Sequence, residues 1–165
     1  MRGIPYGFVA TTLLAQVDAS VGGKNGVNFD GFKNMVGVFN QPRFVICDLA
    51  MLETLPSAEL ANGLAEIVKH AAIYDSDYFD AIENNVPLID ALNPAFIEEL
   101  VHKSVLIKSQ VVNRDEKEAG ERRKLNFGHT FGHAIEKCTG LAHGEAVSVG
   151  MVLAARFSQH RTGFP

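Results

Sequence analysis

From residue 57 onward, apolar residues recur at the three- and four-residue spacing of helices that bury one face. This pattern predicts helices over residues 57–72, 77–84, 93–112, 125–138 and 144–161. Ser57, and Asn93 before its proline, are suited to begin helices, and Gly140 and Gly163 are suited to end them. The expected fold class is therefore mainly α.

Residues 1–56 differ from this helical part, because they are rich in glycine and asparagine and their apolar runs are short. Val9–Leu14 and Phe44–Cys47 are predicted to be short buried strands or extended segments. Residues 17–37 lie between them and contain five glycines, which predicts a long functional loop. The chain is thus expected to have a small extended or β portion, 1–56, and a helical domain, 57–165.

Composition excludes several classes of protein. The formal net charge is −4, which gives no general attraction to nucleic acid or to anionic membranes. No apolar run reaches the roughly 20 residues that a membrane helix needs. The two cysteines, Cys47 and Cys138, do not suggest a disulfide framework. We expect a cytoplasmic protein without nucleic-acid or membrane partners. Neither end has the features of a domain boundary, so the chain is expected to be part of a longer protein.

The most informative motif is LNFGHTFGHAIE, residues 125–136. His129 and His133 are four residues apart, so on a helix both imidazoles lie on one face, a common spacing for metal ligands. Two surface histidines on a helix that packs through its glycines would give the same pattern. A zinc peptidase is disfavoured, because Thr130 occupies the position where that motif has its glutamate base.

Two further segments add candidate ligands. In LAHGEAVSVGM, His143 is either a third imidazole of the site or a residue that merely flanks a helix start. In GLAEIVKH, Glu66 and Lys69 lie on a helix that is apolar nearly all round and is therefore predicted to be buried. Buried charges need partners, either each other or an ion. A glutamate beside two histidines would make a zinc site with one open position.

Basic residues lie beside the glycine-rich and histidine-bearing segments. Such cations bind phosphate and carboxylate groups, although most lysines in proteins are simply solvated. They suit a small polyanionic substrate. The residues are Lys24, Lys33, Lys69, Lys108, Arg122 and Arg123.

Taken together, the motifs resemble those of the 3-dehydroquinate synthase family. The similar stretches are MRGIPY, TTLLAQVDASVGGKNGVN, KNMVGVFNQP, TLPSAELANGLAEIVKH, LNFGHTFGHAIE and HGEAVSVGM. They occur in the family's order and cover nearly the whole chain. The family's N-terminal domain is Rossmann-like, but no Gly-x-Gly-x-x-Gly follows a strand here. The resemblance therefore implies a remnant of the nucleotide-side segment in 1–56, with the NAD-binding domain absent, and a truncated metal- and substrate-binding domain in 57–165.

The resemblance also implies roles for individual residues. The divalent metal, most often zinc and sometimes cobalt, would be held by Glu66, His129 and His143, with His133 contacting substrate instead. Catalytic residues would be Lys69, Lys108, Arg122, Asn126 and His133. Substrate-binding residues would be Arg2, Asp18, Lys24, Lys33 and Asn34, with Arg2 reaching across a homodimer. NAD contacts would come from Thr11, Thr12, Lys24, Lys33, Met51, Leu52, Glu53 and Thr54.

The implied reaction belongs to the shikimate pathway, which leads to aromatic amino acids. NAD and the metal serve the cyclisation of 3-deoxy-D-arabino-heptulosonate 7-phosphate to 3-dehydroquinate with loss of phosphate, a carbon–oxygen lyase reaction. Two alternatives stay open: another sugar-phosphate cyclase of the inosose or valiolone type, and a truncated chain that binds metal or a partner without catalysis. Little turnover is expected from this chain alone.

Overall fold

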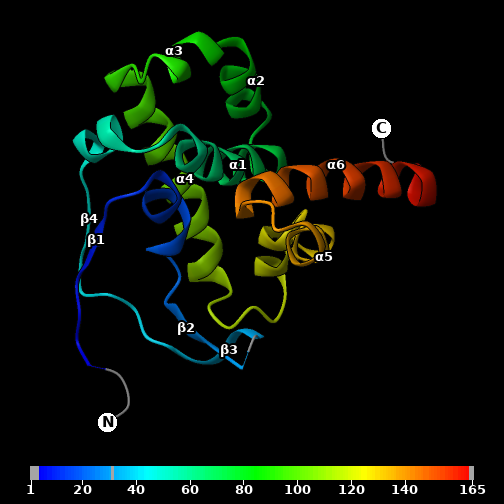
Figure 1. Cartoon of the computed structure of the whole chain (residues 1–165), viewed down its shortest axis with the longest axis horizontal. Coiled ribbons are helices and arrows are strands. Elements are labelled where there is room, and N and C mark those ends of the chain that lie inside the picture. Colours follow the sequence, from blue (N-terminus) through cyan, green and yellow to red (C-terminus); the bar gives the residue numbers. More distant parts are fainter. Residues whose placement is uncertain (1–3, 31, 164–165) are drawn as a thin grey trace.

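The structure is a computed structural model that describes residues 4–30 and 32–163, and helices dominate it (Figure 1). The predicted mainly α fold with a small β portion is confirmed. The elements in chain order are β1 (Phe8–Ala10), the π-helical turn η1 (Ala15–Ala19), β2 (Lys24–Phe29), β3 (Phe32–Phe39), β4 (Val45–Cys47), the 3-10 helix η2 (Leu49–Thr54), α1 (Ser57–Tyr74), α2 (Ser76–Asn84), α3 (Val86–Asp90), α4 (Pro94–Arg114), the 3-10 helix η3 (Glu121–Asn126), α5 (His129–Thr139) and α6 (His143–Thr162). No helix in the described ranges is long and apolar enough to cross a bilayer.

The helix ends follow local chemistry, with two corrections. Asn93 caps α4 as predicted, and Gly140 and Gly163 end α5 and α6 in the left-handed region, with φ values of 73° and 69°. Ser57 is not a cap, because α1 begins on it and the capping position is the preceding proline. The predicted helix at 125–138 begins four residues later, because Gly128 has a φ of 79° and separates η3 from α5. The short helix α3 was not predicted.

The prediction of a loop over residues 17–37 is wrong. β2 and β3 form an antiparallel ribbon in which Lys24 pairs with Phe39 and Val27 with Val36. One of the glycines that suggested a loop allows close backbone approach within the ribbon: a Cβ at Gly37 would lie 2.5 Å from the carbonyl oxygen of Asn25. β1 and β4 form a parallel pair, and β4 is exposed rather than buried as predicted.

Helix α1 lies at the centre of the molecule and positions the site. It packs against α2 and α4 through the main apolar core, and also against α6 and η1 (Figure 1). Tyr78 of α2 is fully buried in this core, where its hydroxyl donates to the carbonyl oxygen of Leu100 at 2.7 Å. One turn of α1 can therefore present side chains both toward α5 and α6 and toward η1 and α4.

Candidate metal centre

Glu66 and Lys69 of α1 are buried, as predicted from the apolar sequence around them. Their side chains are 0% and 2% exposed, and the Lys69 ammonium forms an ion pair with Oε2 of Glu66. The pair keeps each charge compensated inside the fold, where an isolated charge would be costly. The other carboxylate oxygen of Glu66, Oε1, faces α5 and α6.

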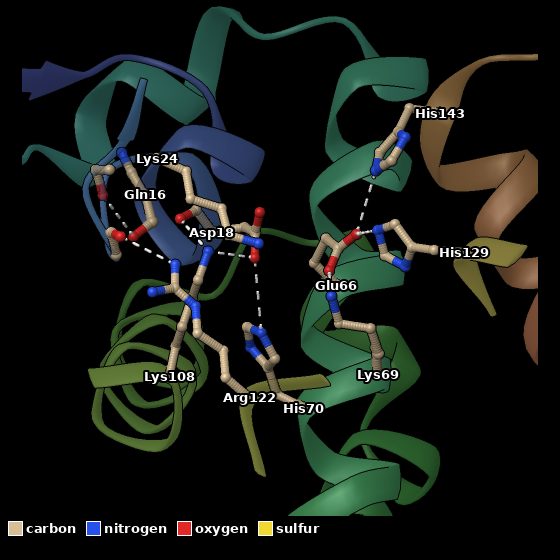
Figure 2. A network of polar contacts seen from close by, with 12 residues as sticks. Gln16, Asp18, Lys24, Glu66, Lys69, His70, Lys108, Arg122, His129 and His143 are labelled. Atoms are coloured by element: carbon tan, nitrogen blue, oxygen red, sulfur yellow. Dashed lines mark hydrogen bonds and ion pairs between the residues drawn. The ribbon is translucent and has the colours of Figure 1, made fainter. Parts of the chain in front are cut away.

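His129 opens α5 and His143 opens α6, and both rings point at Oε1 of Glu66 (Figure 2). The distances from Oε1 to the two Nε2 atoms are 3.5 Å and 3.2 Å. Ligands about 2.0–2.1 Å from a tetrahedral zinc ion lie about 3.3–3.4 Å from one another. The structure thus brings together the three residues that the resemblance implied as metal ligands. Both distances from Oε1 of Glu66 are close to the distance between two ligands of a tetrahedral zinc ion. The donor set, a carboxylate with two imidazoles, fits a divalent cation such as zinc.

The spacing of His129 and His133 alone suggested a different pair of ligands. His133 lies one turn farther along α5, is exposed, and has its ring centroid 5.3 Å from that of His129. Its ring borders the cluster, while the third donor comes from α6. The interpretation of both histidines as a surface pair is also wrong for His129, whose side chain is 16% exposed.

Burial and neighbouring charges shift the pKa of each of the three donors. Burial raises the pKa of Glu66, but the hydrogen bond from His143 and the charge of Lys69 outweigh it and lower the pKa below its usual value. Burial and Lys69 lower the pKa of His129. The hydrogen bond to Glu66 raises the pKa of His143. A carboxylate and a neutral His129 are the forms that bind metal.

A close approach of α1 and α6 sets the position of His143. The backbone N–H of Gly144 donates to Oδ1 of Asn62 at 2.9 Å, and a Cβ at Gly144 would lie 2.5 Å from the Asn62 Cα. Asn62 is one turn before Glu66 on α1, so this contact places the first residue of α6 beside the carboxylate. Glycine at 144 is therefore a packing requirement of the site.

A second polar cluster borders Glu66 on the side of α1 that faces η1 and α4 (Figure 2), and ligand atoms of Asp18, Glu66 and His70 lie within 4.8 Å of one another. The Lys108 ammonium of α4 donates to Oδ1 of Asp18 in η1 at 2.6 Å, and Nε2 of His70 lies 3.8 Å from the same oxygen. Burial lowers the pKa of Lys108, although Asp18 opposes this effect. Burial raises the pKa of Asp18, but the charges of Lys108 and Lys69 outweigh it and lower the pKa.

Arg122 joins the glycine-rich segment to the turn before η3. Its guanidinium donates to the carbonyl oxygens of Gly22 at 2.9 Å and Glu116 at 2.6 Å, and the residue is 3% exposed. Gly22 has a φ of 112°, and a Cβ there would lie 2.6 Å from Nη2 of Arg122. Asp115 holds the turn by accepting backbone hydrogen bonds, including one from Arg122. Arg122 is thus fixed in place before any ligand binds.

Glu118 is a candidate site residue that the sequence analysis missed. Its carboxylate forms an ion pair with Lys24 and accepts from Nδ2 of Asn126 at 2.7 Å. Burial raises its pKa, but these two hydrogen bonds outweigh burial and lower it. Its backbone is in the left-handed region, with φ 58°. No motif marked it, because it sits among the charged residues of a connector.

The remaining predicted residues fall in two groups. Thr11 and Thr12 follow β1, and residues 51–54 follow β4 within η2, so both segments lie beyond the carboxyl ends of paired parallel strands. Dinucleotides bind at such edges in α/β sheets, so the placement fits NAD. Arg2 lies outside the described residues, and the side chains of Lys33 and Asn34 are likewise not described.

His70 gives the structure a testable pH dependence. It is fully buried, neither ring nitrogen has a hydrogen-bond partner in the described part of the chain, and burial with the charge of Lys69 lowers its pKa to about 4. Between pH 6.5 and 4 the unfolded chain binds a proton at His70 that the folded chain does not. Lowering the pH from 6.5 to 4 should therefore reduce the free energy of unfolding. His70 should account for about 3 kcal/mol of this loss.

Urea unfolding of the metal-free chain and of His70→Gln at pH 7, 5.5 and 4 measures this contribution. The variant should lose less stability than the unaltered chain as the pH falls. Equal losses in the two proteins would show that His70 is not held neutral by the fold.

Comparison with known proteins decides the family. Residues 63–165 match the family model described as 3-dehydroquinate synthase C-terminal, and residues 1–62 match the one described as 3-dehydroquinate synthase N-terminal. The chain belongs to the 3-dehydroquinate synthase family. The family that the sequence motifs resemble is thereby confirmed.

Sequence identity to individual relatives supports the same assignment to the 3-dehydroquinate synthase family. It is 51% identical over 163 residues to the 3-dehydroquinate synthase of Geobacter sp. (strain M21) and 50% identical to that of Citrifermentans bemidjiense. These alignments cover 97% of the chain but 45% of each relative, so the chain spans about half their length.

Solved structures of related cyclases have the same fold. The 2-epi-5-epi-valiolone synthase of Streptomyces hygroscopicus subsp. jinggangensis 5008, with NAD+ and Zn2+ bound, is 34% identical with a TM-score of 0.89, covering 97% of this chain and 46% of that one. A 2-deoxy-scyllo-inosose synthase complexed with carbaglucose-6-phosphate, NAD+ and Co2+ is 33% identical with a TM-score of 0.91, covering 99% and 46%.

Proposed function

We propose that this chain supplies the metal-binding and anion-binding side chains of a 3-dehydroquinate synthase active site. The complete enzyme would cyclise 3-deoxy-D-arabino-heptulosonate 7-phosphate to 3-dehydroquinate with loss of phosphate, in the shikimate pathway. The observation that carries the proposal is the convergence of Glu66, His129 and His143, which are far apart in sequence, on one point beside buried cations. The 50–51% identity to curated 3-dehydroquinate synthases supports it. A cytoplasmic homodimer of the complete protein stays a prediction.

Different residues of the chain have different roles in this proposal. Lys69 holds Oε2 of Glu66, so that Oε1 stays directed at the two imidazoles. Lys108 and Arg122 are fixed cations able to neutralise the substrate's phosphate and carboxylate. When bound, zinc or cobalt supplies Lewis acidity at a substrate oxygen, and NAD supplies a hydride acceptor that is regenerated in each turnover.

Two residues at the edge of the cluster remain for substrate. His133 is exposed beside His129, so its ring can contact a bound substrate. Asn126 is held by Glu118 and can turn its amide to a substrate hydroxyl. The family resemblance implies contact with substrate for both His133 and Asn126.

A chimera tests the function, because the chain spans only part of its relatives. The matching segment of the Geobacter enzyme is replaced by this chain, and phosphate release is measured with 3-deoxy-D-arabino-heptulosonate 7-phosphate, NAD and zinc. We expect an active chimera, an inactive Glu66→Gln chimera, and little or no turnover by the chain alone. A folded chimera that binds zinc but releases no phosphate would contradict the proposal and favour a chain without catalytic function.

A second cyclase activity is favoured by one observation: the solved structures that match so well make valiolone and inosose rings. Glucose 6-phosphate, whose carba-analogue is bound in one of them, therefore serves as the competing substrate for the same chimera. Preference for glucose 6-phosphate would assign the chain to that branch. The higher identity to 3-dehydroquinate synthases makes us expect the opposite preference.

A further inference from the structure

His143 lies between two carboxylates, one facing each of its ring nitrogens. Nε2 is 3.2 Å from Oε1 of Glu66, and Nδ1 is 4.0 Å from Oε2 of Glu136. Glu136 is near the end of α5, two turns after His129, and its side chain is 17% exposed. Glu66 belongs to the candidate metal centre, whereas the comparisons and the sequence motifs assign no role to Glu136.

The ring of His143 has one important freedom, rotation about its own side-chain bonds. Its backbone is fixed, because Gly144 donates to Asn62 and packs on the Asn62 backbone. A neutral imidazole carries one N–H and one lone pair, and only the lone pair binds a metal. A group that accepts the proton of Nδ1 therefore leaves the lone pair on Nε2, the nitrogen that would bind a cation held between His143 and Glu66.

We propose that Glu136 is a positioning residue for the metal centre, which accepts the Nδ1 proton of His143 and fixes the ring so that Nε2 faces the cation. This inference rests on the proposed metal centre and adds to it a residue outside the three ligands. The 4.0 Å separation is about 1 Å longer than a hydrogen bond. The proposal requires a rotamer adjustment of the Glu136 side chain, which is 17% exposed, to close that gap.

A different arrangement of the same groups would give a different result. Ligand atoms of His133, Glu136 and His143 all lie within 4.8 Å of one another, so they could instead hold a second cation. In that arrangement Glu136 would be a ligand, and removing it would change the number of ions bound. In the arrangement that we propose, removing the Glu136 carboxylate changes the affinity for a single ion.

The test is titration of the metal-free chain with Zn²⁺ against a chromophoric chelator, together with the visible spectrum of the Co²⁺-loaded chain. We expect one equivalent of zinc in every protein. Glu136→Ala should weaken binding about 10- to 100-fold. Glu136→Gln should weaken it less, because its amide oxygen can accept the same proton. The Co²⁺ spectrum should change in Glu136→Ala, while the unfolding midpoint of the metal-free protein should not.

Glu145→Gln is the matched control. Glu145 is an exposed carboxylate two residues from His143 that caps the backbone N–H of Ala142, a role that glutamine keeps. Its affinity should equal that of the unaltered chain. Unchanged affinity in Glu136→Ala, an equal loss in Glu145→Gln, or a second zinc equivalent that disappears in Glu136→Ala would each overturn the proposal. Failure of the unaltered chain to bind zinc would overturn the metal centre itself, a distinct result.

Discussion

Glu66→Gln should lower the zinc affinity of the chain on the order of 100-fold or more and should also destabilise the metal-free fold. A four-ligand zinc site contributes ~10–16 kcal/mol, so one ligand contributes about 3 kcal/mol, or about 100-fold in affinity. The same substitution leaves the ammonium of Lys69, 2% exposed, without its carboxylate. Breaking such a buried pair typically costs about 3–5 kcal/mol. Chelator competition and urea unfolding measure the two effects.

A double variant separates ligand loss from misfolding. Glu66→Gln combined with Lys69→Met removes both buried charges, so the stability of the metal-free chain should largely return. Zinc affinity should stay low, because the carboxylate ligand is still missing. Glu83→Gln, at an exposed position on α2, controls for loss of a negative charge. Recovery of zinc binding in the double variant would show that Glu66 acts through the fold and not as a ligand.

Asp18→Asn should destabilise the chain by about 3 kcal/mol or more, because it leaves the buried Lys108 without its counter-ion. The Lys108 ammonium donates to both the side chain and the backbone carbonyl of Asp18, so it ties η1 to α4. Urea unfolding at pH 7 measures the loss. The double variant Asp18→Asn with Lys108→Met should regain most of it.

The Asp18–Lys108 pair links the residues before α1 to the helical part. Lys103→Met is a matched control on α4, because its ion pair with Glu99 is exposed to solvent and should contribute little. If Asp18→Asn destabilised the chain no more than Lys103→Met, the Asp18–Lys108 pair would be merely a surface contact. The anchoring of η1 on α4 would then have to come from apolar contacts alone.

Local sequence patterns predicted the helices because helix-forming information is local. The apolar spacing and the glycine after α5 are visible within a single segment, and both appear in the structure. The ribbon of β2 and β3 was missed because its glycines permit close strand contact as well as turns. The short helix α3 has Pro87 in its first turn and too few residues for a periodic signal.

The site was less accessible to local reasoning. The four-residue spacing in α5 pointed to His129 and His133, whereas the structure joins His129 to Glu66 of α1 and His143 of α6. Contacts between residues so far apart in the chain depend on tertiary packing, which periodicity does not encode. The family resemblance supplied that grouping. Glu118 had no such signal, because its contacts with Lys24 and Asn126 exist only after folding.

In the proposed metal centre, three side chains from α1, α5 and α6 share one divalent cation. A crystal structure of the zinc-loaded chain, with data collected at the zinc absorption edge, tests it most directly. We expect one anomalous peak about 2.0–2.2 Å from Oε1 of Glu66 and from Nε2 of both His129 and His143. A peak bound by His129 and His133 without Glu66, or no peak between these helices, would contradict it.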